Sequence, residues 1–500
     1  MPSPLTRRSL LGAGLGVGSL ALAACSGGDA PGQSAAAPDP DAHVVLRDPD
    51  VVAASGARAA LLVSAGLFER ARVAVVAAGE ADHAAAAEVA QRLRVPALPG
   101  DADGLTEELE RLGTEVVRTV GEPEGGWGDR LGDREATTED PDVRVDDPAR
   151  GLTLLVATKA RLDDPSYTLA VATARAAGAG EPVVVAGDPR GTDRLADFRK
   201  DVGDTRVVAI GPGLGPDGSS SSPEAVEHRL TMALGARELP GGGVLPFPGR
   251  HLVALYGQPR TPALGVLGEQ GPGGAVKLAK RYAKDYASLV DGPVQPAFEI
   301  IATTALGSPG KDNLYSGVMP PGWIEPWVDA AEKAGILVIL DLQPGRASML
   351  DQAKKYERLL ARPHVGLALD PEWKLTKDQL PLQQIGSVDV AEINEVGDWL
   401  AALVTRKNLP QKIFTIHQFR LDMIRHRERL ASWDELATVI HVDGSGTPGM
   451  KFDTWRAIRQ DMPAGVHLGW KNFIDEDTPM LTPRQTVEQV KPFPALITYQ

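Results

Sequence analysis

Two carboxylates stand two residues apart where an apolar run ends. In the stretch LALDPEW, Leu367–Trp373, Asp370 and Glu372 follow the apolar residues. Residues i and i+2 of a strand face the same way, roughly 6.5 Å apart, so both side chains can point to one place if the strand continues through Pro371. Repulsion between two partly buried carboxylates raises the pKa of one of them. The result is one proton donor and one charged partner, which are the groups that cleave a glycosidic bond.

Eight short apolar segments after residue 250 give this pair a structural context. Amphipathic segments separate most of them; in GAVKLAKRYAKDYASLV, for example, Val276, Ala279, Ala283 and Tyr286 recur at helical spacing. Eight strands with connecting helices in about 250 residues are what a (β/α)₈ barrel, or TIM barrel, requires. The predicted strands are residues 252–257, 297–301, 337–342, 365–370, 413–419, 438–444, 466–473 and 495–500.

Functional side chains of such a barrel project from the carboxyl ends of its strands. The predicted ends carry more acids, histidines and aromatic residues than a purely structural barrel needs. Besides Asp370 and Glu372, the candidate catalytic residues are Glu299, Asp341 and Asp443. The candidate substrate-binding residues, some of which could stack on sugar faces, are Tyr256, Gln343, Trp373, His417, Gln418, Trp470 and Lys471.

The two histidines at strand ends allow a metal site as an alternative. His417 and His441 could bind zinc or manganese together with Asp443 or Asp370, since imidazole and carboxylate suit these ions. However, the first predicted strand lacks the His-x-His of metal-dependent amidohydrolase barrels. The pattern therefore favours buried, hydrogen-bonded histidines, and we expect no metal or other cofactor.

Several other classes of site have no support in the sequence. We expect Lys471 to neutralise a carboxylate rather than form a Schiff base, and Arg346 to pair with Asp341. The glycine-rich stretches GLGPDG and GEQGPGG lack a P-loop lysine, so no nucleotide partner is expected. The net charge of −14, without a basic stripe, argues against a nucleic-acid partner. The single cysteine, Cys25, excludes cysteine-based zinc sites and internal disulfides.

The barrel segment resembles known glycosidases at one motif. An Asp-x-Glu at the end of the fourth strand resembles the chitinase-like and bacterial-muramidase-like hydrolase barrels. That resemblance implies Glu372 as the general acid and Asp370 as its partner. The chitinase-like series has further aspartates upstream on the strand, and HVGLALDPEW has none. The stretches LDLQPGR, DPEWKL and GWKNFIDEDTPMLTP also resemble an uncharacterised glycoside-hydrolase-like barrel of exported actinobacterial proteins, which implies no substrate.

The segment before the barrel contains an approximate repeat of strand, Ala-rich helix, short strand after a Pro, helix and strand. One copy spans Arg72–Gly121 and the second runs from Leu152 to Gly211. This alternation predicts parallel sheets flanked by helices. The order resembles a degenerate cell wall-binding repeat 2 domain, which implies binding of a wall polymer.

The N-terminus has the features of a lipoprotein export signal. Residues 1–24 combine a cationic start containing Arg7 and Arg8 with an apolar stretch. The motif Leu22-Ala23-Ala24-Cys25 resembles a lipobox, and the start resembles a twin-arginine signal. The resemblance implies lipidation of Cys25 and anchoring to the outer face of the cytoplasmic membrane.

We therefore expect an α/β chain with four parts. These are a signal peptide (1–24), a flexible Gly/Pro/Ala-rich linker (25–42), a repeat domain (43–240) and a barrel (248–500). The favoured function is an envelope lipoprotein whose barrel binds or hydrolyses an envelope glycan. The alternatives are a non-catalytic wall-binding scaffold and a metal-dependent deacetylase or esterase.

Overall fold

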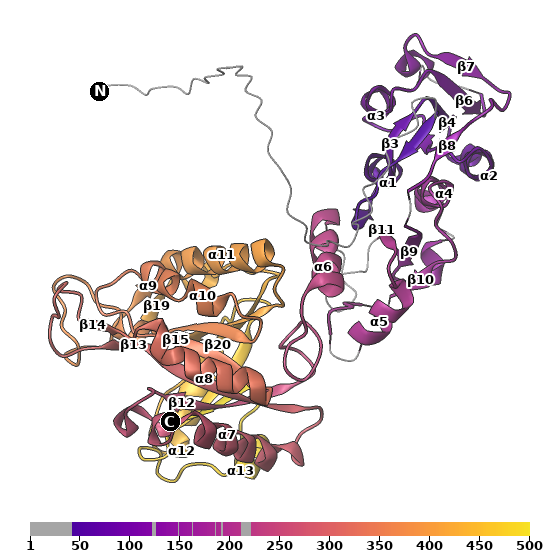
Figure 1. Ribbon diagram of the computed structural model, residues 1–500. Coiled ribbons are helices and arrows are strands. Elements are labelled where there is room, and N and C mark those ends of the chain that lie inside the picture. The colour runs from indigo at the N-terminus through magenta and orange to yellow at the C-terminus, as the bar shows by residue number, and fades with distance from the viewer. Residues whose placement is uncertain are drawn as a thin grey trace, which may run out of the picture. The chain divides into compact units, whose positions relative to one another are not determined.

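Figure 1 shows the computed structural model of the chain. The structure describes residues 43–122, 127–148, 150–162, 164–185, 187–191, 194–211 and 222–500. The predicted signal peptide, the linker and Cys25 lie outside these ranges. None of the helices formed by the described residues is long and apolar enough to cross a membrane.

The C-terminal region is a closed barrel of eight parallel strands, as the sequence predicted. β12 pairs with β22 on one side and with β13 on the other, which closes the sheet. A short strand, β14 (Ser316–Val318), pairs antiparallel with the end of β13. The barrel strands are β12 (His251–Gly257), β13 (Val294–Ala305), β15 (Leu337–Leu342), β16 (Val365–Leu369), β18 (Lys412–His417), β20 (Leu436–Val442), β21 (His467–Asn472) and β22 (Leu496–Tyr499).

Side chains of these strands alternate between the barrel interior and the helix layer. In β15, Leu337 and Ile339 belong to the core inside the barrel, whereas Val338 and Leu340 belong to the core between barrel and helices. This is the two-residue period of a strand, applied to a sheet that is buried on both faces. It explains why the strands read as continuous apolar runs. It also determines which residue at each strand end can reach the mouth.

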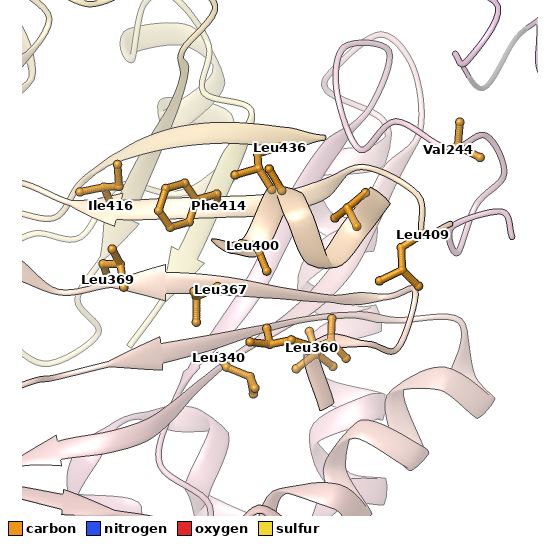
Figure 2. Close-up of a cluster of buried hydrophobic side chains, with 14 of the residues drawn as sticks. Val244, Leu340, Leu360, Leu367, Leu369, Leu400, Leu409, Phe414, Ile416 and Leu436 are labelled. Carbon is orange, nitrogen blue, oxygen red and sulfur yellow. The ribbon is translucent and has the colours of Figure 1, made fainter. Parts of the chain in front are cut away.

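Helices cover the outside of the barrel. Figure 2 shows part of this layer, in which Leu367 and Leu369 of β16 and Phe414 and Ile416 of β18 lie near Leu400 of the longest helix. Several helices begin at a Ser, Thr or Asp whose side chain accepts a hydrogen bond from the first turn, the usual N-cap. The helices are α7 (Pro272–Ala287), α8 (Pro321–Ala334), α9 (Met349–Lys355), α10 (Glu357–Leu360), α11 (Val390–Lys407), α12 (Pro448–Ile458) and α13 (Pro483–Gln489). Two short strands outside the barrel sheet, β17 (Val388–Asp389) and β19 (Ile424–Arg425), pair with each other.

The N-terminal region contains two four-stranded parallel sheets with corresponding strand orders. The first has the order β5-β4-β6-β7 and the second β10-β9-β11-β2. The strands are β2 (Val51–Ala54), β4 (Val73–Ala77), β5 (Ala97–Pro99), β6 (Val116–Val120), β7 (Glu135–Thr137), β9 (Leu152–Val156), β10 (Val183–Val184) and β11 (Arg206–Ile210). In the first sheet the chain runs from β4 through a helix to β5, and then through another helix to β6. In the second sheet it runs in the same way from β9 to β10 and then to β11.

Among the described residues of this region there are also six α-helices and a small third sheet. The sheet has the order β3-β1-β8, from β1 (Val44–Leu46), β3 (Phe68–Ala71) and β8 (Val145–Asp146). The helices are α1 (Ala59–Leu67), α2 (His83–Leu93), α3 (Leu105–Leu112), α4 (Thr168–Ala176), α5 (Leu195–Val202) and α6 (Pro223–Gly235). Between α6 and β12 the chain forms turns and bends only. The domain boundary that the sequence suggested near residues 238–250 lies in this segment and stays a prediction.

Candidate functional site

The mouth of the barrel gathers polar side chains from most of its strands. Strand alternation places Tyr256, Glu299, Asp341, His417 and Lys471 on the interior face, one from each of five strands. All five are buried. They surround or lie beneath a cavity of about 290 Å³ that opens at the carboxyl ends of the strands. The position is the one at which TIM barrels place functional residues.

An ion-paired triad of side chains, Glu299, His417 and Asp443, crosses the barrel interior below the mouth. The ring of His417 lies between two carboxylates: Nε2 is 2.7 Å from Glu299 Oε1, and Nδ1 is 2.8 Å from Asp443 Oδ2. Burial alone would lower the pKa of His417. The charge of Glu299 and the hydrogen bond and charge of Asp443 outweigh burial and raise this pKa well above its usual value. His417 is therefore an imidazolium that donates from both ring nitrogens.

This pairing fixes the charge of Asp443. Burial alone would raise the pKa of Asp443, but the hydrogen bond and the charge of His417 lower it below the usual value. Asp443 also lines the cavity. Its second oxygen, Oδ1, is buried without a hydrogen-bond partner among the described residues. The result is a carboxylate that stays ionised and has one oxygen free for a ligand.

His441 lies next to this ion-paired triad but differs from His417 in charge. Its Nε2 is 3.1 Å from Thr498 Oγ1, and its Nδ1 is 4.0 Å from Glu299 Oε2. Burial and then the charge of His417 lower the pKa of His441 well below its usual value, so it is neutral. Gly469 on the neighbouring strand makes room for it, since a Cβ there would lie 2.6 Å from the His441 ring. This is the buried, hydrogen-bonded role that the sequence favoured.

Tyr256 and Asp341 form a second interior pair. The Tyr256 hydroxyl donates to Asp341 Oδ2 at 2.8 Å and accepts from Gln343 Nε2 at 3.3 Å. Burial raises the pKa of Asp341 to about 6, although the charge of His417 opposes the shift. Gln343 also accepts from the backbone N–H of Ala305, which holds its amide at the cavity wall.

Asp370 and Glu372 both line the cavity, but by a different route from the one expected. The strand β16 ends at Leu369, and a 3₁₀ turn, Pro371–Trp373, follows. The strand does not continue through Pro371, which was the condition for the two side chains to face the same way along it; proline has no N–H to donate to a neighbouring strand. The turn nevertheless brings Asp370, Glu372 and Trp373 to the same cavity.

The environment of these two acids favours their protonated forms. Burial, followed by the negative charge of Asp443, raises the pKa of Glu372 to about 7. Burial and the charge of Glu372 raise the pKa of Asp370 well above its usual value. The cavity therefore holds protonated or titrating acids facing an ionised one. Lys471 is the cation of the cavity wall, with its Nζ 3.8 Å from the centre of the Tyr256 ring.

Three residues do not take the places that the sequence suggested. Trp470 faces the helix layer, where it contacts Phe452 and Trp455 and donates from Nε1 to Asn472. The alternation of β21 sends Lys471 inward and therefore Trp470 outward. Gln418 is buried and accepts from Arg427 instead of lining the cavity.

The third is Arg346, which does not pair with Asp341. Its guanidinium donates to the carbonyl oxygen of Gln379 and stacks over the ring of Tyr315. His417, and not an arginine, is the cation that contacts the buried acids Glu299 and Asp443.

Two aromatic cavity residues were missed by the sequence analysis. Phe419 and Phe473 line the cavity, and each stands two residues after an interior side chain, His417 and Lys471. The same two-residue period could have identified them, because residues that continue a strand in extended form keep facing the same side.

The donor groups also fall into two sets that could hold a metal ion. One is Glu299, His417 and His441, and the other is Asp370, His417 and Asp443; in each set three ligand atoms lie within 4.8 Å of one another. Both sets require His417, whose two ring nitrogens already contact carboxylate oxygens. A metal would have to replace one of these contacts and the proton on that ring nitrogen. The contacts therefore favour the ion-paired triad over a metal site.

The mouth concentrates buried oxygens that have no partner. Buried carboxylate oxygens without a hydrogen bond from the described residues occur at Glu299, Asp341, Asp370 and Asp443, all in the barrel. Such groups cost stability unless water or a ligand completes them, and they gather where a function needs them. No protein-family model matches the chain, and no curated protein matches it, so the site itself carries the argument for function.

Proposed function

We propose that the barrel hydrolyses a glycosidic bond at the cavity formed by Asp370, Glu372 and Asp443. The observation that supports this most strongly is the opposite tuning of two acids on one cavity. Burial raises the pKa of Glu372 to about 7, whereas His417 lowers the pKa of Asp443. A protonated acid and an ionised carboxylate at neutral pH are the two groups that glycoside hydrolysis requires.

The proposal assigns a distinct role to each acid. Glu372 donates its proton to the leaving oxygen, and Asp443 stabilises or attacks the positively charged sugar carbon. Asp370 stays protonated and hydrogen-bonds to the substrate. An oxygen of Asp370 and an oxygen of Asp443 lie within 4.8 Å of each other. Asp370 is therefore placed to contact the same sugar ring as Asp443.

Two features of the wall support a carbohydrate substrate. Aromatic rings of Tyr256, Trp373, Phe419 and Phe473 line the cavity together with the amide of Gln343. Apolar rings suit the faces of sugar rings, and a few placed polar groups fix their orientation. The indole N–H of Trp373 is buried without a partner among the described residues, so it can donate to a ligand.

The test is an assay of the full-length chain against a panel of bacterial envelope glycans, with reducing-end formation as the readout. We expect cleavage by the native chain and its loss in Glu372→Gln and in Asp443→Asn. Asp378→Asn is the matched control, because Asp378 is exposed in the same segment and does not line the cavity. Cleavage that survives both cavity substitutions would contradict the proposed roles.

Two other functions make different predictions in the same assay. A non-catalytic binding protein would retain glycans without releasing reducing ends. A metal-dependent deacetylase or esterase would release acetate or another acid, contain bound metal, and lose activity on treatment with a chelator. The two possible donor sets around His417 are the observation that favours this last reading.

We further propose that the chain is an exported lipoprotein anchored through Cys25, with a wall-polymer-binding role for the repeat domain. The support is the sequence alone: the cationic and apolar start, the lipobox-like motif and the repeat order. Expression in a bacterium with labelled palmitate should give a labelled, membrane-associated chain. Cys25→Ala should lose both label and membrane association, and retention of either would contradict the assignment.

A further inference from the structure

Three lysines of the barrel region are buried, and they differ in how their ammonium groups are satisfied. These are Lys412, Lys451 and Lys471. Lys412 Nζ donates to the carbonyl oxygen of Arg362 at 2.8 Å. Lys451 Nζ donates to the carbonyl oxygen of Lys471 at 2.6 Å and forms an ion pair with Asp477. Both therefore have at least one oxygen that accepts a hydrogen bond from the side-chain nitrogen.

Lys471 has none of these partners. Within the part of the chain that the structure describes, no oxygen accepts a hydrogen bond from its Nζ and no carboxylate lies within ion-pairing distance. Its ammonium lies over the Tyr256 ring at 3.8 Å from the centroid and 5.0 Å from that of Phe473. The rings hold the ammonium from one side by cation–π attraction and leave its N–H groups without an oxygen.

The ammonium is placed where a ligand can reach it. Lys471 lines the same cavity as Glu372 and Asp443, and no other lysine or arginine of the described residues does so. Its charge lowers the pKa of both acids, so it acts across the cavity on them. A lysine whose only function is to neutralise a carboxylate would be expected in contact with it, as Lys451 is with Asp477.

We propose that Lys471 is the binding site for a carboxylate carried by the substrate, and hence that the barrel acts on an acidic glycan such as one containing a uronic acid. The inference rests on the glycosidase function proposed above and specifies its substrate class. A carboxylate fits better than a phosphate because the cavity offers a single cation beside several acids. Phosphate sites normally supply several donors, from arginines, helix N-termini or backbone nests.

The test compares three ligands on the full-length chain by calorimetry. The ligands are a glucuronate-containing oligosaccharide, the same oligosaccharide with its carboxyl groups reduced to glucose, and its 6-phosphorylated counterpart. We expect the carboxylate form to bind at least tenfold more tightly than the reduced form, and more tightly than the phosphorylated form. Equal binding of the first two ligands, no binding of either, or tightest binding of the phosphate would overturn the inference.

Substitutions assign the selectivity to the residue. Lys471→Met should weaken binding of the carboxylate form at least tenfold more than binding of the reduced form. Lys280→Met, at an exposed position on α7, is the matched control and should change neither. The native-chain comparison requires no variant, so it decides the question even if Lys471→Met fails to fold.

The outcome separates this inference from the glycosidase proposal, because calorimetry compares the ligands and reducing-end formation measures turnover. A chain that prefers the carboxylate form but cuts no glycan contradicts hydrolysis and supports the role of Lys471. A chain that cuts a neutral glycan and shows no carboxylate preference contradicts only the role of Lys471.

Discussion

The N-terminal α/β region and the barrel both contain parallel sheets, but they treat buried polar groups differently. In the N-terminal region, the buried carboxylate of Glu108 accepts from Ser64 at 2.5 Å and from two nitrogens of Arg111 at 2.7 Å. In the barrel, Asp370 and Asp443 each keep a buried oxygen without a partner among the described residues. The N-terminal region satisfies both oxygens of Glu108, whereas the barrel mouth leaves one oxygen of each of these acids available.

The difference indicates where the molecule binds something. A satisfied buried acid contributes to the definition of a fold, whereas an unsatisfied one costs stability and persists only if it serves a ligand or a reaction. This contrast predicts that substitutions of buried acids will affect stability in one region and activity in the other.

The largest effect is expected on catalysis in the barrel. Glu372→Gln and Asp443→Asn should each lower kcat/KM by roughly 10²–10⁴-fold, because each removes a proton donor or a charged partner from the reaction. Thermal unfolding of the same variants should remain cooperative. Loss of a folded state in both would instead assign these acids a structural role.

The next effect is on the stability of the N-terminal region. Glu108→Ala should lower the free energy of unfolding by about 2–4 kcal/mol, since it leaves Arg111 and Ser64 without their shared acceptor. Glycan cleavage by the barrel should be unchanged. Glu110→Ala, on the exposed face of α3, is the control and should change stability little. Chemical denaturation followed by circular dichroism measures the difference.

A third effect is on the pH dependence of stability. The pKa of Glu372 is about 7 in the folded chain, against an ordinary value of 4.5. Between these values the folded state keeps a proton that the unfolded state has lost, so native stability falls as pH rises from about 4.5 to about 7. Glu372→Gln removes this loss and should raise the free energy of unfolding at pH 8 by about 2 kcal/mol. Equal pH profiles for both chains would mean that Glu372 is not perturbed.

The smallest effect compares two buried tyrosines of the barrel region. Tyr256 donates to Asp341 inside the barrel, and Tyr286 pairs with Tyr499 in the helix layer. Phenylalanine at either position should cost about 1 kcal/mol of stability for one lost hydrogen bond. Only Tyr256→Phe should also lower kcat/KM, because Tyr256 lines the cavity. A comparable loss of activity in Tyr286→Phe would contradict the division between interior and helix layer.

The sequence predicted the barrel well because its signals are local. Each strand is a short apolar run between turns, and each connecting helix has its own periodicity, so the eight strands were found within a few residues of their observed bounds. The orientation of individual strand ends was less secure. The assignment of Trp470 to the mouth ignored the alternation that places Lys471 inward, and the turn at Pro371 was not foreseen.

The electrostatics of the site could not be predicted in the same way. His417 contacts Glu299, 118 residues earlier, and Asp443, 26 residues later. Closure of the barrel produces these contacts, and no sequence spacing reveals them. Whether Asp443 or Asp370 carries the charge depends on that contact, so the sequence identified the acids but assigned the charged role to Asp370.

The most direct test of this account is a titration of the carboxyl carbons by NMR, on full-length chain labelled with ¹³C at the side-chain carboxyls of Asp and Glu. We predict a glutamate that titrates near pH 7 and disappears in Glu372→Gln, and an aspartate that titrates below the usual range and disappears in Asp443→Asn. If the Glu372 signal titrates at an ordinary value near 4.5, or if Asp443 titrates above Glu372, the paired acid and carboxylate do not exist and the proposed function loses its basis.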